Sequence, residues 1–303
     1  MATAVGVDVG GTHLRVVAQA AGGPRSRVHD VPVPRDADAL TAEIVRLSRA
    51  AAGDAAAGEV TTLAVGLPGR TGDAVPRWVP NLPFLDGFPL AEVLADRLGG
   101  GCVLLNDAQA TAVAELREGA LRGRSSALLV ALGTGIGGAV VLGGRLVRGE
   151  RGCAGAFGWL PADRGETGGG ETGGGGAGGV HGPWEQVASG AALERAGRPW
   201  GGAAGLVAAA RAGDDGALVT IDAFGELLGR GTAALASMLD PEVIVVAGGL
   251  SDALDLLRAP TLRAHVRHAS PAGREVPLVR ATLGPGAGVV GALHVALAPE
   301  VLL

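Results

Sequence analysis

The 303-residue chain is 48% hydrophobic and 18% charged, a composition typical of a globular protein that excludes a disordered one. Its net charge is −5 and no Lys/Arg-rich run occurs, so no nucleic-acid partner is expected. No apolar stretch reaches the roughly 20 residues of a membrane helix, and the first residues predict a strand rather than a secretory leader, so we expect a cytoplasmic protein with no membrane partner.

The first part of the chain predicts an antiparallel meander of three strands, followed by alternating helices and strands. Short apolar runs indicate the strands, and apolar residues at helical spacing indicate the helices. The predicted ranges are strands 4–9, 14–19 and 26–33, helix 37–52, strand 61–66, helix 89–98, strand 102–105 and helix 107–116.

The same pattern then begins again. Both VGVDVGGT and LVALGTGIGG combine an apolar strand, a Gly/Thr turn and a second strand, which predicts an internal duplication. The remaining predicted ranges are strands 126–132, 136–142 and 145–148, helix 216–239, strand 243–247, a helix after Gly248-Gly249, and a last helix at 286–298. Residues 165–179 are low in complexity and predict a mobile surface loop.

Two Gly/Thr turns carry the first candidate chemistry. Asp8 precedes a first turn formed by Gly10, Gly11 and Thr12. About 120 residues later, Gly133, Thr134 and Gly135 form a second turn of the same kind. Glycines let backbone N–H groups approach phosphate oxygens, and Asp8 is suited to hold Mg²⁺, through water. An ordinary Gly hairpin is the alternative for either turn. Neither turn has the Gly-Lys-Ser/Thr of a P-loop, or the helix that follows the glycines of a dinucleotide site.

Two further pairs stand at the carboxyl ends of predicted strands. Gly248-Gly249 is suited to pack against adenosine, or is only a helix-entry turn. Asn106-Asp107 stands at the start of a helix. A carboxylate at this place is suited to accept a proton from an attacking hydroxyl, and the alternative is that it serves only as the N-cap. Position alone favours the N-cap.

The ordered set of motifs resembles the sugar kinases of the ROK (repressor, open reading frame, kinase) family over nearly the whole chain. The motifs are Asp8–Thr12, Gly66-Leu67-Pro68-Gly69, Asn81-Leu82, Asn106-Asp107-Ala108, Gly133–Gly138 and Gly248-Gly249. The resemblance implies an α/β, duplicated RNase H-like fold of the actin/hexokinase type with two domains and a cleft between them. It places a small domain at 1–106, joined by the C-terminal helix 287–303, and a large domain at 107–286.

The same resemblance implies roles for individual residues. Asp107 would be the general base, and Gly69, Asn81, Asn106 and Glu185 would contact the sugar. The two turns and Gly248-Gly249 would bind ATP with Mg²⁺. The resemblance is also compatible with a homodimer.

Two departures from the family pattern bear on the substrate. The family's Gly-Glu-Ile-Gly-His is here Gly155–Trp159, so Ala156 and Trp159 replace the Glu and His that hold sugar hydroxyls. Losing a charged partner costs roughly 1.5–3 kcal/mol per buried hydrogen bond. Trp159 offers an apolar face and one N–H donor, unless it only fills the core. These changes predict a modified sugar, such as an amino sugar, a deoxy sugar or a C7-cyclitol, phosphorylated at a primary hydroxyl.

The second departure concerns the zinc module of the family, because this chain lacks the cysteines of that module. Cys102 and Cys153 do not form a zinc motif, so we expect no zinc. Three alternatives stay open: an ordinary glucokinase with compensating groups, a kinase homologue that binds sugar or nucleotide without turnover, and a sugar-sensing regulator. The regulators of the family carry a helix-turn-helix ahead of this region, and Asp8 lies too near the start of the sequence for one.

Overall fold

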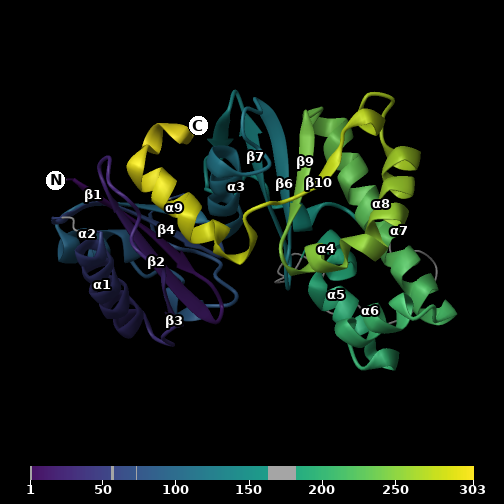
Figure 1. Cartoon of the computed structure of the whole chain (residues 1–303), viewed down its shortest axis with the longest axis horizontal. Helices are drawn as coiled ribbons and strands as arrows, with labels where there is room; N and C mark the ends of the chain where they lie inside the picture. Colours follow the sequence, from purple (N-terminus) through teal and green to yellow (C-terminus); the bar gives the residue numbers. More distant parts are fainter. Residues whose placement is uncertain (1, 56–57, 73, 163–181) are drawn as a thin grey trace. The chain divides into compact units, whose positions relative to one another are not determined.

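The computed structural model describes residues 2–55, 58–72, 74–162 and 182–303. Within them lie two five-stranded sheets and the helices that cover them (Figure 1). The strands are β1 Thr3–Val9, β2 His13–Ala20, β3 His29–Pro32, β4 Val60–Leu67, β5 Gly101–Asn106, β6 Ser126–Leu132, β7 Ile136–Leu142, β8 Arg145–Val147, β9 Val243–Ala247 and β10 Leu278–Arg280. The α-helices are α1 Ala37–Asp54, α2 Leu90–Leu98, α3 Asp107–Glu118, α4 Pro183–Ala188, α5 Gly190–Ala196, α6 Ala203–Arg211, α7 Asp215–Leu239, α8 Leu254–His268 and α9 Ala287–Leu297.

The two sheets repeat one topology. The first has the order β3-β2-β1-β4-β5, with β1, β2 and β3 antiparallel and β1, β4 and β5 parallel. The second has the order β10-β9-β6-β7-β8, in which β6, β9 and β10 are parallel and β7 and β8 antiparallel. Each strand of the first sheet therefore has a counterpart five strands later, and the predicted duplication is confirmed.

The chain also divides into two compact units. Unit 1 comprises residues 1–125, 139–155 and 282–303, and unit 2 comprises residues 126–138 and 156–281. This grouping is not the division at residue 106 that the sequence predicts, and the domain bounds stay a prediction.

Unit 1 is layered around its sheet. Helices α1 and α2 cover one face, and α9 lies on the other beside α3 (Figure 1). A Cβ on Gly6 of β1 would lie 2.3 Å from the backbone nitrogen of Leu293, and a Cβ on Gly291 of α9 would lie 1.7 Å from the carbonyl oxygen of Ala110. The two glycines therefore let α9 touch the backbones of both β1 and α3.

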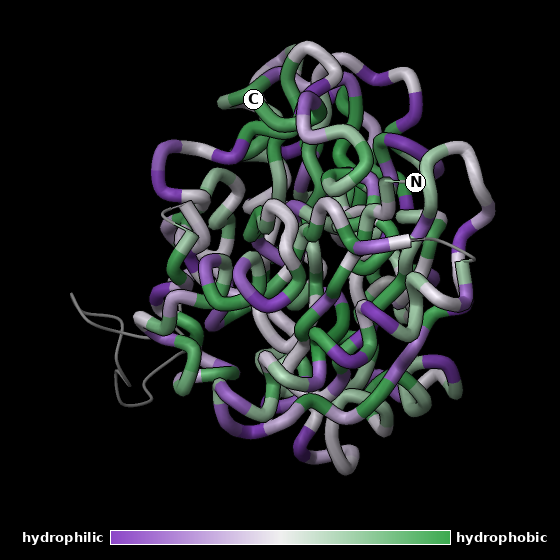
Figure 2. Tube along the Cα trace, turned by 90° about the vertical axis from the view of Figure 1, so that its left-hand side faces the viewer, coloured by the Kyte–Doolittle hydropathy of each residue, from purple (hydrophilic) through white to green (hydrophobic). Residues whose placement is uncertain are grey.

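The hydrophobic core of unit 1 lies between its sheet and α1 and α2, and includes Val7, Val16, Leu40, Ile44 and Val65. Figure 2 shows hydrophobic and hydrophilic stretches alternating along the chain, with several hydrophilic stretches in the loops at its edges. No helix among the described residues is long and apolar enough to cross a membrane.

Unit 2 contains the pair of helices α7 and α8 and the shorter helices α4, α5 and α6. Helices α7 and α8 approach closely, because a Cβ on Gly229 would lie 2.4 Å from the Cβ of Ala264. The helices α4–α6 and strand β10 were not predicted. The predicted loop at 165–179 lies outside the described residues.

Candidate functional site

Five predicted site residues gather at one edge of the unit 1 sheet. In the parallel register Asp8 of β1 lies beside Gly66 of β4, and Leu67 lies beside Asn106 of β5. The carboxyl ends of the three strands therefore bring Asp8, Gly69, Asn106 and Asp107 to the same edge, where open α/β sheets bind ligands. Asn81 also reaches this edge, since a Cβ on Gly11 would lie 3.7 Å from the Cβ of Asn81.

The first Gly/Thr turn is closed by its backbone. The N–H of Gly10 donates to the carbonyl of His13 at 2.9 Å, and the carbonyl of Thr12 accepts from Val33 at 3.0 Å. In the part of the chain that the structure describes, the N–H groups of Gly11 and Thr12 have no backbone acceptor among these turn bonds. N–H groups without a backbone acceptor are what a phosphate turn requires.

Asp8 lies in a negative environment. Burial and the neighbouring charge of Asp107 raise the pKa of Asp8 to about 6, although Arg15 opposes the shift. Its side chain is 14% exposed, and a Cβ on Gly288 of α9 would lie 3.0 Å from its carboxylate. A buried carboxylate without a full cationic partner fits a hydrated Mg²⁺, which prefers one or two carboxylates and several waters.

The sequence left open whether Asp107 is the N-cap of α3 or a general base, and the contacts of Asn106 and Asp107 bear on this. Asn106 is the N-cap of α3: its Oδ1 accepts from the N–H of Ala108 at 3.0 Å, and its Nδ2 donates to the carbonyl of Gly69 at 3.2 Å. Asp107 is the first helical residue, and its Oδ1 accepts from the same N–H at 2.8 Å. The cap at this helix is therefore Asn106 rather than Asp107.

Burial among protein atoms raises the pKa of Asp107, and the N–H of Ala108 lowers it. The side chain is nevertheless exposed to solvent, which limits the size of the shift. Gly69 has φ of 100°, and a Cβ there would lie 2.6 Å from the carbonyl oxygen of Trp78. Glycine is thus required beside Asn106.

The second Gly/Thr turn lies in unit 2. The N–H of Gly133 donates to the carbonyl of Gly135 at 3.0 Å, so this turn closes on itself like the first. Gly248, with φ of 93°, lies against β6, because a Cβ there would be 2.3 Å from the carbonyl oxygen of Leu132. Unit 2 therefore brings Gly248 beside the strand that leads into Gly133, Thr134 and Gly135, and Gly249 follows it.

Trp159 and Glu185 also lie in unit 2. The side chain of Trp159 is exposed (44%), so it does not fill the core as one alternative held. Trp184, by contrast, is buried, with an exposed fraction of 2%. Glu185 Oε2 accepts a hydrogen bond from the N–H of Ile136 at 2.7 Å.

Arg15 was not singled out from the sequence. It stands opposite Asp8 in the β1–β2 register, with its guanidinium 3.7 Å from the Asp8 carboxylate and 3.0 Å from that of Asp30. Counting residues across the predicted hairpin would have found it. The neighbouring His13 is exposed, and its Nδ1 lies 2.8 Å from the carboxylate of Asp30.

No group of three or more His, Cys, Asp and Glu side chains suited to a metal occurs among the described residues. The predicted zinc-free character of the chain stays a prediction, because residues 163–181 lie outside that part of the chain.

A family profile described as the ROK family matches residues 4–299. A glucokinase from Streptomyces coelicolor is 31% identical over the full length of both chains. An N-acetyl-D-glucosamine kinase from Pectobacterium atrosepticum is 32% identical, covering 82% of this chain and 84% of its own.

Solved structures agree in fold. A ROK hexokinase from Thermus thermophilus has a TM-score of 0.83 at 32% identity, covering 98% of this chain and 99% of its own. A ROK glucokinase from Streptomyces griseus in complex with glucose and AMPPNP has a TM-score of 0.76 at 29% identity, covering 97% and 99%. The expected two-domain actin/hexokinase-like fold is confirmed.

Proposed function

We propose that this chain, which belongs to the ROK family and is an ATP-dependent sugar kinase like its relatives named glucokinase and N-acetyl-D-glucosamine kinase, phosphorylates a primary hydroxyl of a modified sugar rather than of glucose. An amino sugar and a C7-cyclitol are the substrates that we favour. The exposed indole of Trp159 carries this proposal.

Ala156 and Trp159 stand where the family pattern has a Glu and a His. Ala156 has no hydrogen-bonding side chain, and an indole has one N–H donor beside a large apolar face. A glucose hydroxyl buried at this place would lose its charged partners, at a cost of roughly 1.5–3 kcal/mol each. A substrate that is less polar at that end avoids this cost.

The proposed mechanism assigns phosphoryl transfer to positioning and charge stabilisation. Asp107 would accept the proton of the substrate hydroxyl while Gly69, Asn81 and Asn106 orient the ring. The N–H groups of Gly11 and Thr12 and those of the second turn would bind phosphate oxygens, and Gly248-Gly249 would pack against adenosine. Asp8 would hold Mg²⁺ through water; this ion neutralises charge on the β- and γ-phosphates.

The test is ADP release with ATP and Mg²⁺ across glucose, mannose, fructose, N-acetylmannosamine, glucosamine, kanosamine and C7-cyclitols. We expect one modified sugar or cyclitol to have a kcat/KM well above that of glucose. Glucose as the best substrate would overturn the interpretation of Ala156 and Trp159 and leave the kinase assignment standing.

An ordinary glucokinase is the second candidate, since the Streptomyces coelicolor relative carries that name. It requires other groups to replace the missing Glu and His. A Trp159→His and Ala156→Glu double variant separates the two: it should raise kcat/KM for glucose if the family's polar partners are what the chain lacks. An unchanged value would favour the glucokinase.

A further inference from the structure

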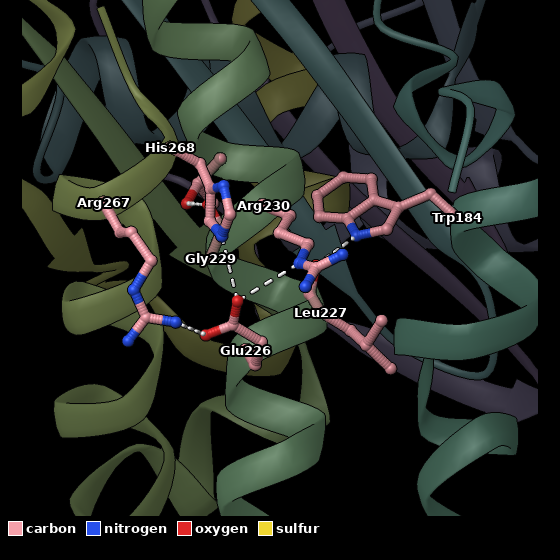
Figure 3. Close-up of polar contacts among 8 residues, drawn as sticks. Trp184, Glu226, Leu227, Gly229, Arg230, Arg267 and His268 are labelled. Atoms are coloured by element: carbon pink, nitrogen blue, oxygen red, sulfur yellow. Dashed lines mark hydrogen bonds and ion pairs between the residues drawn. The ribbon is translucent and has the colours of Figure 1, made fainter. Parts of the chain in front are cut away.

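Helix α4 is fixed to the long helix α7 by a buried indole. Trp184 Nε1 donates to the carbonyl of Leu227 at 3.0 Å, as Figure 3 shows. The ring lies against α7 so closely that a Cβ on Gly231 would be 2.1 Å from it. Only a glycine at 231 allows this contact, so the position of α4 on α7 is narrowly defined.

Helix α7 is in turn joined to α8. The carboxylate of Glu226 accepts from His268 at 2.9 Å and contacts Arg230 at 3.1 Å and Arg267 at 3.3 Å (Figure 3). Helix α4 therefore rests on a pair of helices that hold each other, and the residue after Trp184 has a well-defined position.

That residue is Glu185, whose Oε2 accepts from the N–H of Ile136 at 2.7 Å. Two glycines make room for its side chain. A Cβ on Gly135 would lie 2.3 Å from Glu185 Oε2, and a Cβ on Gly158 would lie 3.1 Å from the Cβ of Glu185. The side chain is thus packed against the end of the second Gly/Thr turn, and the charged acceptor makes this hydrogen bond a strong one.

The opposite side of the turn is held by the start of α5. The N–H of Gly190 donates to the carbonyl of Gly133 at 2.8 Å, and that of Ala191 to the carbonyl of Thr134 at 3.2 Å. Among the bonds that the described residues make in this turn, Thr134 and Gly135 donate to no backbone carbonyl. The turn is therefore fixed through its other groups, while the N–H groups of Thr134 and Gly135 have no backbone acceptor among these bonds.

We propose that Glu185 is a positioning residue for the nucleotide. Its carboxylate fixes the second Gly/Thr turn in a conformation in which the N–H groups of Thr134 and Gly135 bind phosphate oxygens. This rests on the proposed kinase function and gives Glu185 a role besides the predicted sugar contact. A donor array fixed before binding loses less entropy when phosphate arrives. Nucleotide affinity should therefore depend on Glu185 even when no sugar is present.

The test is calorimetric titration of the full chain with AMPPNP and Mg²⁺ in the absence of sugar. We expect Glu185→Ala to weaken binding about tenfold, since it leaves the Ile136 N–H without its acceptor. Glu185→Gln keeps an acceptor oxygen at the same reach and should stay within about threefold of wild type. Thermal unfolding of each variant tests whether the fold is retained.

The outcomes are distinct. A role in sugar contact alone predicts that Glu185→Ala raises the KM for sugar and leaves sugar-free AMPPNP affinity unchanged, which would overturn the proposal. Wild-type protein that binds no AMPPNP would overturn the kinase function as well. Should Glu185→Ala not fold, Glu185→Asp keeps the charge but withdraws the carboxylate from Ile136, and the same weakening is expected.

Discussion

At the scale of single residues, Asp107 is the position on which activity should depend most. Asn106 caps α3, so the carboxylate of Asp107 is not needed to begin the helix. We expect Asp107→Asn to lower kcat by at least about 100-fold, because an amide cannot accept the hydroxyl proton. Steady-state kinetics and AMPPNP titration check this, with nucleotide affinity expected to persist.

The matched control is Asn106→Ala, which removes the cap instead of the base. It should lower the stability of the protein by about 0.5–2 kcal/mol. Near-normal turnover by Asp107→Asn would remove Asp107 from the chemistry. A large loss of stability in Asp107→Ala, which removes the acceptor oxygen that Asn would keep, would return the capping role to Asp107.

His265 gives a pH dependence of stability. Its ring is 1% exposed, Nε2 lies 2.9 Å from the carbonyl of Gly273, and Nδ1 lies 3.1 Å from the hydroxyl of Thr232. Burial lowers the pKa of His265, so the unfolded chain takes up a proton more readily than the folded one. The stability is therefore fully present above the unfolded pKa of about 6.5 and is lost as pH falls below it.

We expect the free energy of unfolding to fall by up to about 1.4 kcal/mol per pH unit below that value for this one group. Urea unfolding between pH 7.5 and 5 measures it. A His265→Gln variant has no proton to take up and should show a shallower dependence. Equal slopes for the two proteins would exclude His265 as the cause.

At the scale of elements, the contacts of α9 depend on glycines. A Cβ on Gly291 would lie 1.7 Å from a backbone oxygen of α3, which cannot move aside as a flexible side chain would. We expect Gly291→Ala to lower stability by about 1–3 kcal/mol or more through overpacking. Thermal and urea unfolding measure the change.

Gly53 near the end of α1 is the control. It is exposed, and nothing lies within 4 Å of a Cβ added there. Gly53→Ala should stabilise the protein by about 0.5–1 kcal/mol, because alanine loses less backbone entropy in a helix. Equal effects of the two substitutions would mean that close packing of α9 is not what Gly291 provides.

Elements with strong local patterns could be predicted from the sequence. The meander, the two Gly/Thr turns, α1 and α7 have clear periodicity or Gly punctuation, and the repeated turn revealed the duplication. Strand β3 is shorter than predicted, beginning at His29, because the hydroxyl of Ser26 takes the N–H of Ala18 that a strand would have used. Strand β10 has only three residues, too few to show a period.

The site was predictable where its residues follow strands. Asp8 and Asn106 stand at strand ends of the unit 1 sheet, and parallel strands bring such ends to one edge, while Gly248 follows β9 of the second sheet. Arg15 and the Ile136 contact of Glu185 were not found, because they depend on register and on packing between distant segments. The sequence shows Glu185 as a motif residue, whereas only the packing of α4 on α7 shows what its carboxylate touches.

At the scale of the whole molecule, unit 1 is assembled from three separate stretches of chain. Its last stretch contains α9, in which Val289, Leu293 and Val295 are fully buried. Burying each such side chain contributes about 1.5–3 kcal/mol, and whole domains have only about 5–15 kcal/mol of net stability. We expect a chain ending at Ala281 not to fold in unit 1.

Size-exclusion chromatography and circular dichroism check this, with aggregation or loss of helix expected. A chain ending at Ala298 keeps α9 and should remain folded. A folded, monomeric product from the shorter chain would show that α9 only covers the sheet and is not required for it.

The attachment of α9 is reinforced by Glu115 of α3. Its carboxylate, which has no exposed surface, accepts from the N–H groups of Thr282 and Leu283, both at 2.9 Å. During synthesis, Glu115 leaves the ribosome more than 160 residues before its partners. At about 5–20 residues per second, roughly ten to thirty seconds pass before α9 is made. During this time the Glu115 carboxylate lacks its two N–H donors, and the face of β1 that α9 covers at Gly6 is exposed. That interval is when a chaperone would have most to bind, and a ribosome pausing late in the message would prolong it.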